Sequence, residues 1–228
     1  MARVLAQWAD EKLFWAAMAY NFSPAGAAQM FASAPPQAAQ AFAEDRAKMR
    51  SGMPRMPLGD ATAAYKSYLR RIANMLDGQD FLLGSAPCVA DFATYHPLWF
   101  TRTRTSVMAP ILDAHPGVLA WMDRMAALGH DRSEPMTATQ SIALSQANTL
   151  AGNGFASILP SEPFQDEHGI ALGSEVTITS ESFGLEPTQG SLVAATRMHY
   201  TLRRHDERAG LVQVHFPRVG YLLKKAQP

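Results

Sequence analysis

Residues 81–95 read FLLGSAPCVADFATY, and they contain the strongest local signal in the chain. Asp91 stands three residues after Cys88, the spacing at which an acidic side chain in the first turn of a helix bonds back to the backbone amide of the residue before the helix. Pro87 and Phe92 stand where two apolar side chains can pack against each other across a helix start. The spacing predicts a helix that begins near Val89, with Cys88 and Asp91 as its structural capping pair.

Outward from this segment, apolar residues recur at three- and four-residue intervals through most of the first 150 residues, the period of helices buried along one face. We expect further helices over 3–22, after the Pro35-Pro36 pair, from Asp60 to Gly78, from Pro116, and over 134–148. Asp60 is the expected N-cap of its helix, because aspartate accepts hydrogen bonds from the free amides of a first turn. The helix over 134–148 is polar and alanine-rich, which favours a position on the surface.

After Gly152 the apolar period changes from about 3.6 to 2, the period of β-strands. The loop HDERAG at 205–210 lies between two such runs and predicts a hairpin over 197–216. Before it, the segment GNGFASILPSEPF at 152–164 is rich in glycine, proline and serine, as linkers are. We therefore predict an α+β chain, with an all-helical domain at 1–150 and a small antiparallel β domain at 151–228.

The expected hairpin pairs Leu202 with Val212 and Tyr200 with Val214, which places His199 opposite His215. Two histidines across a ladder can hold a metal ion, but a site needs three or four ligands. Their neighbours on that face are poor metal ligands: Arg197, Thr201, Arg203 and Gln213. A solvated polar face is the better interpretation, and no metal is expected.

The segment at 81–95, followed by HPGVLAWMDRMAAL at 115–128, resembles the C-terminal helical domain of cytosolic glutathione transferases over about residues 1–130. The positions that fit the family pattern are Phe81, Leu82, Gly84, Asp91, Pro116 and Trp121. Cys88 departs from it, because the family has a capping serine or threonine there and a thiol is a weaker hydrogen-bond acceptor.

The resemblance implies a thioredoxin-like domain ahead of these helices, which binds glutathione and carries the residue that activates its thiol. Met1 already stands at the expected start of the first helix, so the sequence predicts that this domain is missing. No catalytic residue is predicted, and glutathione is expected as a ligand only if the missing domain is supplied. The chain alone is expected to be inactive and to keep the wall of the hydrophobic-substrate site.

In the family that wall comes largely from the first helix of this domain. The resemblance makes substrate-binding candidates of Trp8, Glu11, Lys12, Trp15, Met18 and Tyr20. Trp8, Trp15 and Met18 are spaced to share one helix face, a pattern that is also typical of plain core packing. A second aromatic cluster, at 95–100, is expected to be interior, with His96 as a hydrogen-bonded core histidine.

Composition narrows the remaining possibilities. Twenty basic residues balance twenty acidic ones, so a nucleic-acid or anionic-membrane partner is not expected, and near-neutral chains tend to self-associate. The family also usually forms homodimers, so a homo-oligomer is predicted. A single cysteine, Cys88, excludes an internal disulfide and suits the cytoplasm. That thiol is either buried and inert or, at a helix start, reactive.

Two functional hypotheses follow. The first is a glutathione transferase-like protein that contributes the substrate-side half of the fold for a small hydrophobic substrate. The second is a non-catalytic binding or dimerisation module. A basic cluster in the β domain, Arg203, Arg204, Arg208, Arg218, Lys224 and Lys225, is interpreted either as a site for an anion or another protein, or as a solvated edge.

Overall fold

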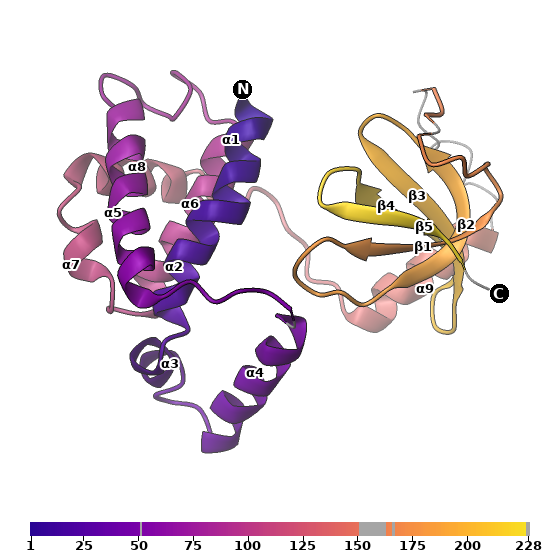
Figure 1. Cartoon of the computed structure of the whole chain (residues 1–228), viewed down its shortest axis with the longest axis horizontal. Coiled ribbons are helices and arrows are strands. Elements are labelled where there is room, and N and C mark those ends of the chain that lie inside the picture. Colours follow the sequence, from indigo (N-terminus) through magenta and orange to yellow (C-terminus); the bar gives the residue numbers. More distant parts are fainter. Residues whose placement is uncertain (51, 151–162, 166, 227–228) are drawn as a thin grey trace. The chain divides into compact units, whose positions relative to one another are not determined.

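The computed structural model describes residues 1–50, 52–150, 163–165 and 167–226, without the side chains of residues 36, 149 and 150. The chain forms two compact units (Figure 1). The helical unit comprises Met1–Asp45 and Pro54–Ser133, and the sheet unit comprises Arg46–Met53 and Glu134–Pro228. Each unit has its own hydrophobic core. Helices and an antiparallel sheet confirm the α+β class.

The helical elements of the described residues follow one another along the chain as α1 (Ala2–Trp8), η1 (Ala9–Leu13), α2 (Phe14–Asn21), α3 (Pro24–Met30), α4 (Pro36–Met49), α5 (Leu58–Met75), α6 (Val89–Arg104), α7 (Ala109–Leu112), α8 (Pro116–Ala127) and α9 (Ala138–Leu150). The first three form one continuous helix, as the apolar period over 3–22 predicts, and η1 is a π-helical turn within it.

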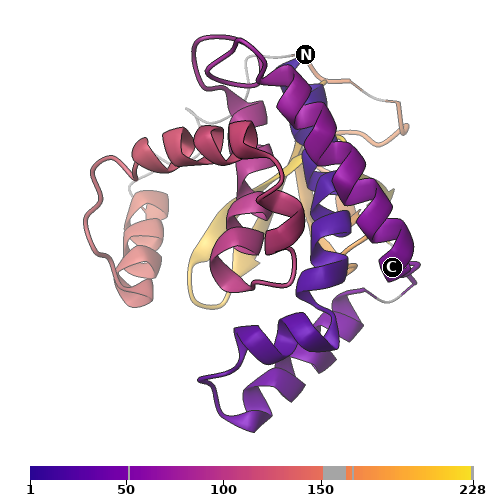
Figure 2. The same ribbon diagram turned by 90° about the vertical axis from the view of Figure 1, so that its left-hand side faces the viewer.

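This first helix packs against α5 and α6, and α8 packs against both of those helices (Figures 1 and 2). Leu13, Tyr65 and Trp121 are completely buried, one from each of three different helices. Large side chains from segments far apart in the sequence therefore meet in one core, which holds the first helix in a fixed position.

The predicted N-cap of α5 is wrong. The helix begins at Leu58, and Asp60 lies inside its first turn. Pro57 precedes the helix, with φ −58° and ψ 146°. Because the fixed backbone of this proline sets the helix start, Asp60 lies too far along the helix to cap its first free amide groups. Gly78, at φ +69°, follows the end of the helix as predicted.

The last helix groups with the sheet. α9 packs on β4, and the Gln146 side-chain amide donates to the backbone carbonyl of Arg208. The predicted domain division at residue 150 thus stays a prediction, whereas the contacts in the structure divide the chain between Ser133 and Glu134. A helical period does not tell which core a helix joins. Most of the predicted linker, 152–162, lies outside the described residues.

The sheet has five antiparallel strands: β1 (Glu175–Ser180), β2 (Thr188–Ala195), β3 (His199–Asp206), β4 (Gly210–Pro217) and β5 (Tyr221–Lys225). Their order is β4-β3-β2-β1-β5, so consecutive strands β4 and β5 stand at opposite ends of it. Three residues join those two strands, and the rings of Phe216 and Tyr221 lie 5.3 Å apart. The sheet must therefore curl strongly, around a core that includes Ile178, Leu192 and Leu202.

The predicted hairpin exists, but its register is wrong by two residues. Leu202 pairs with Val214 and Tyr200 with Phe216. The Asp206 carboxylate accepts the backbone N–H groups of residues 208 and 209 at 2.9 Å and 2.8 Å, and this closes a three-residue loop in place of the longer one expected. A shift of two keeps each side chain on its predicted face.

Candidate functional site

The capping pair forms at the start of α6. The buried Asp91 carboxylate accepts the backbone N–H of Cys88 at 3.0 Å and that of Leu82 at 2.8 Å. It also accepts the indole N–H of Trp121 at 3.0 Å, and the Cys88 thiol donates to it at 3.3 Å. Asp91 therefore joins a loop, a helix start and α8. It is a structural centre rather than a catalytic one, since every group around it is a donor already in use.

Two other residues at the same helix start, Phe92 and Cys88, are partly exposed. Phe92 is 54% exposed, so half of its ring lies in water and its pairing with Pro87 stays a prediction. Cys88 is partly exposed and its thiol donates to a carboxylate.

The candidate substrate residues of the first helix differ in how deeply they are buried. Met18 is 3% exposed and belongs to the core, so it cannot touch a ligand in this conformation. Trp8 and Trp15 are partly buried: Trp8 meets Tyr68 of α5 edge-to-face at 5.1 Å, and Trp15 meets the adjacent Phe14 at 5.1 Å. The two tryptophans cover the rim of the core and keep part of each ring accessible.

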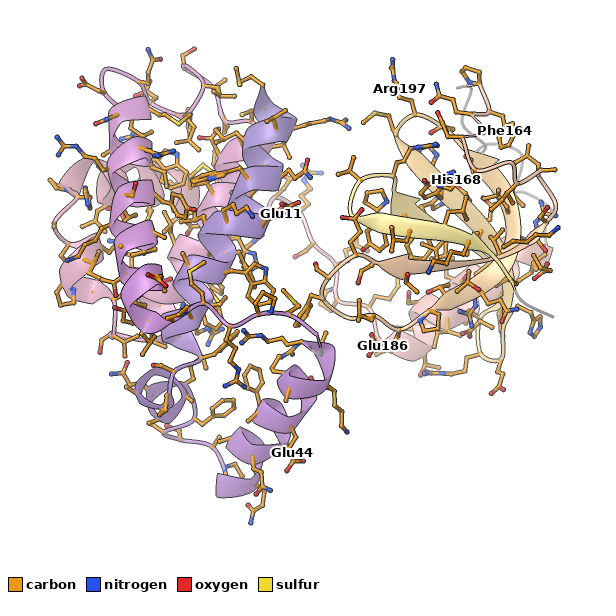
Figure 3. The ribbon with its side chains drawn as sticks, viewed as in Figure 1. Glu11, Glu44, Phe164, His168, Glu186 and Arg197 are labelled. Atoms are coloured by element: carbon orange, nitrogen blue, oxygen red, sulfur yellow. The ribbon has the colours of Figure 1, made fainter. Side chains whose placement is uncertain are left out.

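The remaining candidates are polar. Tyr20 is partly buried, and its hydroxyl is hydrogen-bonded to that of Thr62 on α5. Glu11 and Lys12 are exposed, and Glu11 projects from the helix surface, where it accepts a hydrogen bond from Gln7 at 3.0 Å (Figure 3). The π turn lies between Trp8 and Trp15 and holds an extra residue, so helical spacing alone no longer places both rings on one face.

The sequence analysis missed Asp10, and it did not connect His96 with the first helix. Asp10 belongs to the turn, and its electrostatic partner is His96 of α6. Burial raises the pKa of Asp10 above its usual value, His96 partly offsets that rise, and Glu11 adds to it. A charged triplet at 10–12 inside an apolar period is the signal that could have found this pair, because π turns often occur at functional sites.

His96 itself is not the core histidine that we expected. It is exposed, and its ring stacks on Trp99 one turn later at 6.4 Å and 30°. The Arg104 guanidinium covers the same indole at 5.5 Å. Because α6 buries its opposite face, with Leu98 fully enclosed, position 96 must point to the surface.

In the sheet unit, the histidine pair is diagonal rather than opposite. His215 stands opposite Thr201 and its Nδ1 lies 2.9 Å from that hydroxyl, while the two imidazole rings are 6.3 Å apart. Burial and the proximity of His199 lower the pKa of His215 below its usual value. Among the residues that the structure describes, no three or more His, Cys, Asp or Glu side chains are grouped to hold a metal ion.

Comparison with known proteins places this fold. A family model described as "Glutathione S-transferase, C-terminal domain" matches residues 36–124. A solved GST-like protein from Pseudomonas syringae is 30% identical, with a TM-score of 0.73 over 99% of this chain and 67% of that one. The chain belongs to the glutathione S-transferase family.

A second solved structure, the beta-etherase LigF from Sphingobium sp. strain SYK-6, is 19% identical over 55% of this chain and 56% of that one. Its TM-score of 0.38 is too low to support an inference. No curated protein matches the chain.

Glutathione is the co-substrate that membership of the glutathione S-transferase family implies. The family match begins after the first helix. The assignment of candidate substrate residues on that helix therefore depends on the geometry of this transferase-like chain. None of the helices described here is both long and apolar enough to cross a bilayer.

Proposed function

We propose that this chain is a glutathione transferase-like protein whose first helix forms the wall of a site for a small hydrophobic substrate. In this proposal glutathione is bound, and its thiol activated, by the thioredoxin-like domain that the family places ahead of these helices. The single observation that carries the proposal is the half-buried state of Trp8 and Trp15 on a helix whose other large apolar side chains include the buried Leu13 and Met18.

The side chains of the proposed wall have different roles in substrate binding. Trp8, Trp15 and Tyr20 offer flat, partly apolar surfaces that can cover a hydrophobic ligand and exclude water. Glu11 and Lys12 are exposed beside them and can contact the polar part of a substrate. Met18 supports the wall from behind, because it is buried. In this proposal thiol activation, and with it conjugation, depends on the glutathione-binding domain.

A binding measurement tests the wall. We expect Trp8→Ala and Trp15→Ala each to weaken binding of a fluorescent hydrophobic dye by about tenfold, since each removes a large apolar contact surface. Trp99→Ala, which removes a partly buried tryptophan from α6, is the matched control and should leave dye affinity unchanged. Large stability losses in the Trp8 and Trp15 variants with unaltered dye affinity would show that these rings are only core.

Thermal unfolding with glutathione tests whether the glutathione site belongs to a separate domain. A ligand that binds only the folded state must raise the melting temperature. We expect millimolar glutathione alone to give no rise with the 228-residue chain, and the hydrophobic dye to bind regardless. A rise would place a glutathione site within this chain and overturn the assignment of that site to a separate domain.

A specific feature favours the alternative, a dimerisation module. The first helix packs on α6 along its length, with Asp10 within electrostatic reach of His96 and the Asn21 amide donating to Thr101 at 3.2 Å, so the two helices run parallel. Their starts therefore lie at the same end of the helical unit, where Val4 is 70% and Phe92 54% exposed. Sedimentation equilibrium of wild type and Val4→Glu separates the two: a dimer that the substitution dissociates supports the module, and a wild-type monomer rejects it.

A further inference from the structure

The end of the first helix contributes to a chain of buried polar side chains. Asn21 is completely buried, and so are Thr101 of α6 and Thr105, the residue that follows α6. The Thr105 hydroxyl donates to the Asn21 side-chain oxygen at 2.7 Å, and the Asn21 amide donates to the Thr101 hydroxyl oxygen at 3.2 Å. The Thr101 hydroxyl in turn donates to the backbone carbonyl of Pro97 at 2.6 Å. A directed chain of hydrogen bonds therefore joins the first helix to α6.

The rest of the buried side of the first helix does little to fix its position along α6. Residues 2–21 are all described by the structure, and four of their seven buried side chains are alanines: Ala6, Ala9, Ala16 and Ala17. Methyl groups let two helices approach closely but project too little to interlock. Met18 is flexible and adapts to its surroundings, so only Leu13 and Asn21 remain to define one position.

The hydrogen bonds of Asn21 are complete in one register only. A slide of the first helix by one turn, about 5.4 Å in either direction, would separate Asn21 from one or both threonines. In one direction it would put Ala17 in the place of Asn21, and a methyl side chain forms no hydrogen bonds. Hydroxyl and amide groups would then be buried without partners, which costs free energy. A buried asparagine sets the register of coiled-coil helices in the same way.

The preceding residue, Tyr20, joins the same end of the first helix to α5. Because the Thr62 hydroxyl donates to the Leu58 carbonyl at 2.7 Å, the Tyr20 hydroxyl is the donor in its bond to Thr62. This bond is only part-buried, so water competes with it, whereas the bonds of Asn21 are buried and therefore stronger. Asn21 is thus the main polar determinant of where the helix lies.

We propose that Asn21 is a positioning residue: its hydrogen bonds to Thr101 and Thr105 select the register of the first helix on α6. Through that register Asn21 holds the side chains of the substrate wall in place. The effect on ligand binding rests on the proposed function, because it requires that the first helix forms such a wall. The selection of the register does not depend on that function.

Fluorine NMR of the whole chain, labelled with 5-fluorotryptophan, tests the register. Trp8 lies edge-to-face on Tyr68 of α5 at 5.1 Å, so a slide of the first helix changes the surroundings of its ring. The test variant combines Asn21→Leu, Thr101→Val and Thr105→Val, which replaces the polar chain by apolar side chains of similar shape. Such replacements often leave a protein folded and stable.

The wild type is expected to give one sharp signal for each of its four tryptophans. In the triple variant we expect the Trp8 signal to split or broaden, because more than one register is populated. The Trp121 signal should stay unchanged, since its indole donates to Asp91 at 3.0 Å. The variant should also bind the hydrophobic dye at least about twofold more weakly, because apparent affinity falls with the fraction of chains in the binding register.

Thr94→Val is the matched control for the threonine substitutions. Thr94 also lies on α6 and is completely buried, but its hydroxyl has no hydrogen-bond partner among the residues that the structure describes. We expect this variant to keep the wild-type signals and the wild-type dye affinity.

Three results would overturn the proposal. The first is an unchanged Trp8 signal in the triple variant, and the second is equal splitting in Thr94→Val. The third is a triple variant that no longer folds, because the polar chain would then support folding itself rather than select a register. A wild-type chain that binds no dye would instead reject the substrate wall, and the fluorine signals would still decide the register.

Discussion

At the scale of single residues, Asp91 holds together more of the helical unit than any of the proposed substrate residues. Its carboxylate serves two backbone amides, a thiol and the indole of Trp121 while lying completely out of water. Removing an acceptor of this kind leaves buried donors without partners, and each such group costs about 1–3 kcal/mol.

Asp91→Ala is therefore expected to lower the free energy of unfolding by about 3–4 kcal/mol, because three N–H donors lose their acceptor. Asp91→Asn should cost less, since one oxygen remains. Urea unfolding measures both. The control is Asp123→Asn, whose exposed carboxylate pairs with Arg102 at 2.7 Å and should cost at most about 1 kcal/mol. Equal losses at the two positions would contradict the role given to Asp91.

His215 links the stability of the sheet unit to pH. Its folded-state pKa lies below the ordinary 6.5, because burial and His199 disfavour its charged form. As pH falls below 6.5, the unfolded chain takes up this proton first, so the free energy of unfolding decreases until the folded-state pKa is passed. His215→Asn should flatten this part of the stability–pH curve, as measured by urea unfolding at a series of pH values.

At the scale of elements, two glycines near helix starts give opposite expectations. A Cβ atom at Gly26, in α3, would lie 2.4 Å from the backbone carbonyl oxygen of Asn21, whereas one at Gly117, in α8, would meet nothing within 4 Å. The first helix and α3 therefore approach closely only because residue 26 has no side chain.

Gly26→Ala should destabilise the chain by about 1–3 kcal/mol, because backbone must move to admit the methyl group. Gly117→Ala should stabilise it by about 0.5–1 kcal/mol, since alanine loses less conformational entropy in a helix. Chemical denaturation of both variants gives the comparison. A stabilising Gly26→Ala would mean that the contact between the two helices is looser than the structure shows.

At the scale of the whole molecule, each unit has a core of its own, so each has the means to fold as a unit. Leu202→Ala opens a cavity in the sheet unit and should cost about 2–5 kcal/mol there. We expect it to lower one unfolding transition and to leave the loss of helical circular dichroism from the helical unit unchanged. A single transition that shifts as a whole would show that the two units unfold together.

Much of the local structure follows from residue spacing. The three- and four-residue period over 3–22 predicts the first helix, the Cys88–Asp91 interval predicts the start of α6, and the two-residue period predicts the hairpin. Each depends on neighbours within one or two turns, so the sequence alone carries the information. The family resemblance at 81–95 and 115–128 rests on the same kind of local pattern.

The tertiary structure alone decides what depends on distant segments. Packing against α5 and α6 separates the candidate wall into the buried Met18, the half-buried tryptophans and the exposed Glu11 and Lys12. A π turn, which local spacing does not reveal, brings Asp10 to His96, and a tight turn at Asp206 shifts the hairpin register. Periodicity in the sequence determines which side of a helix or strand is apolar. Which segment that side packs against depends on the free energy of contacts between side chains far apart in the sequence.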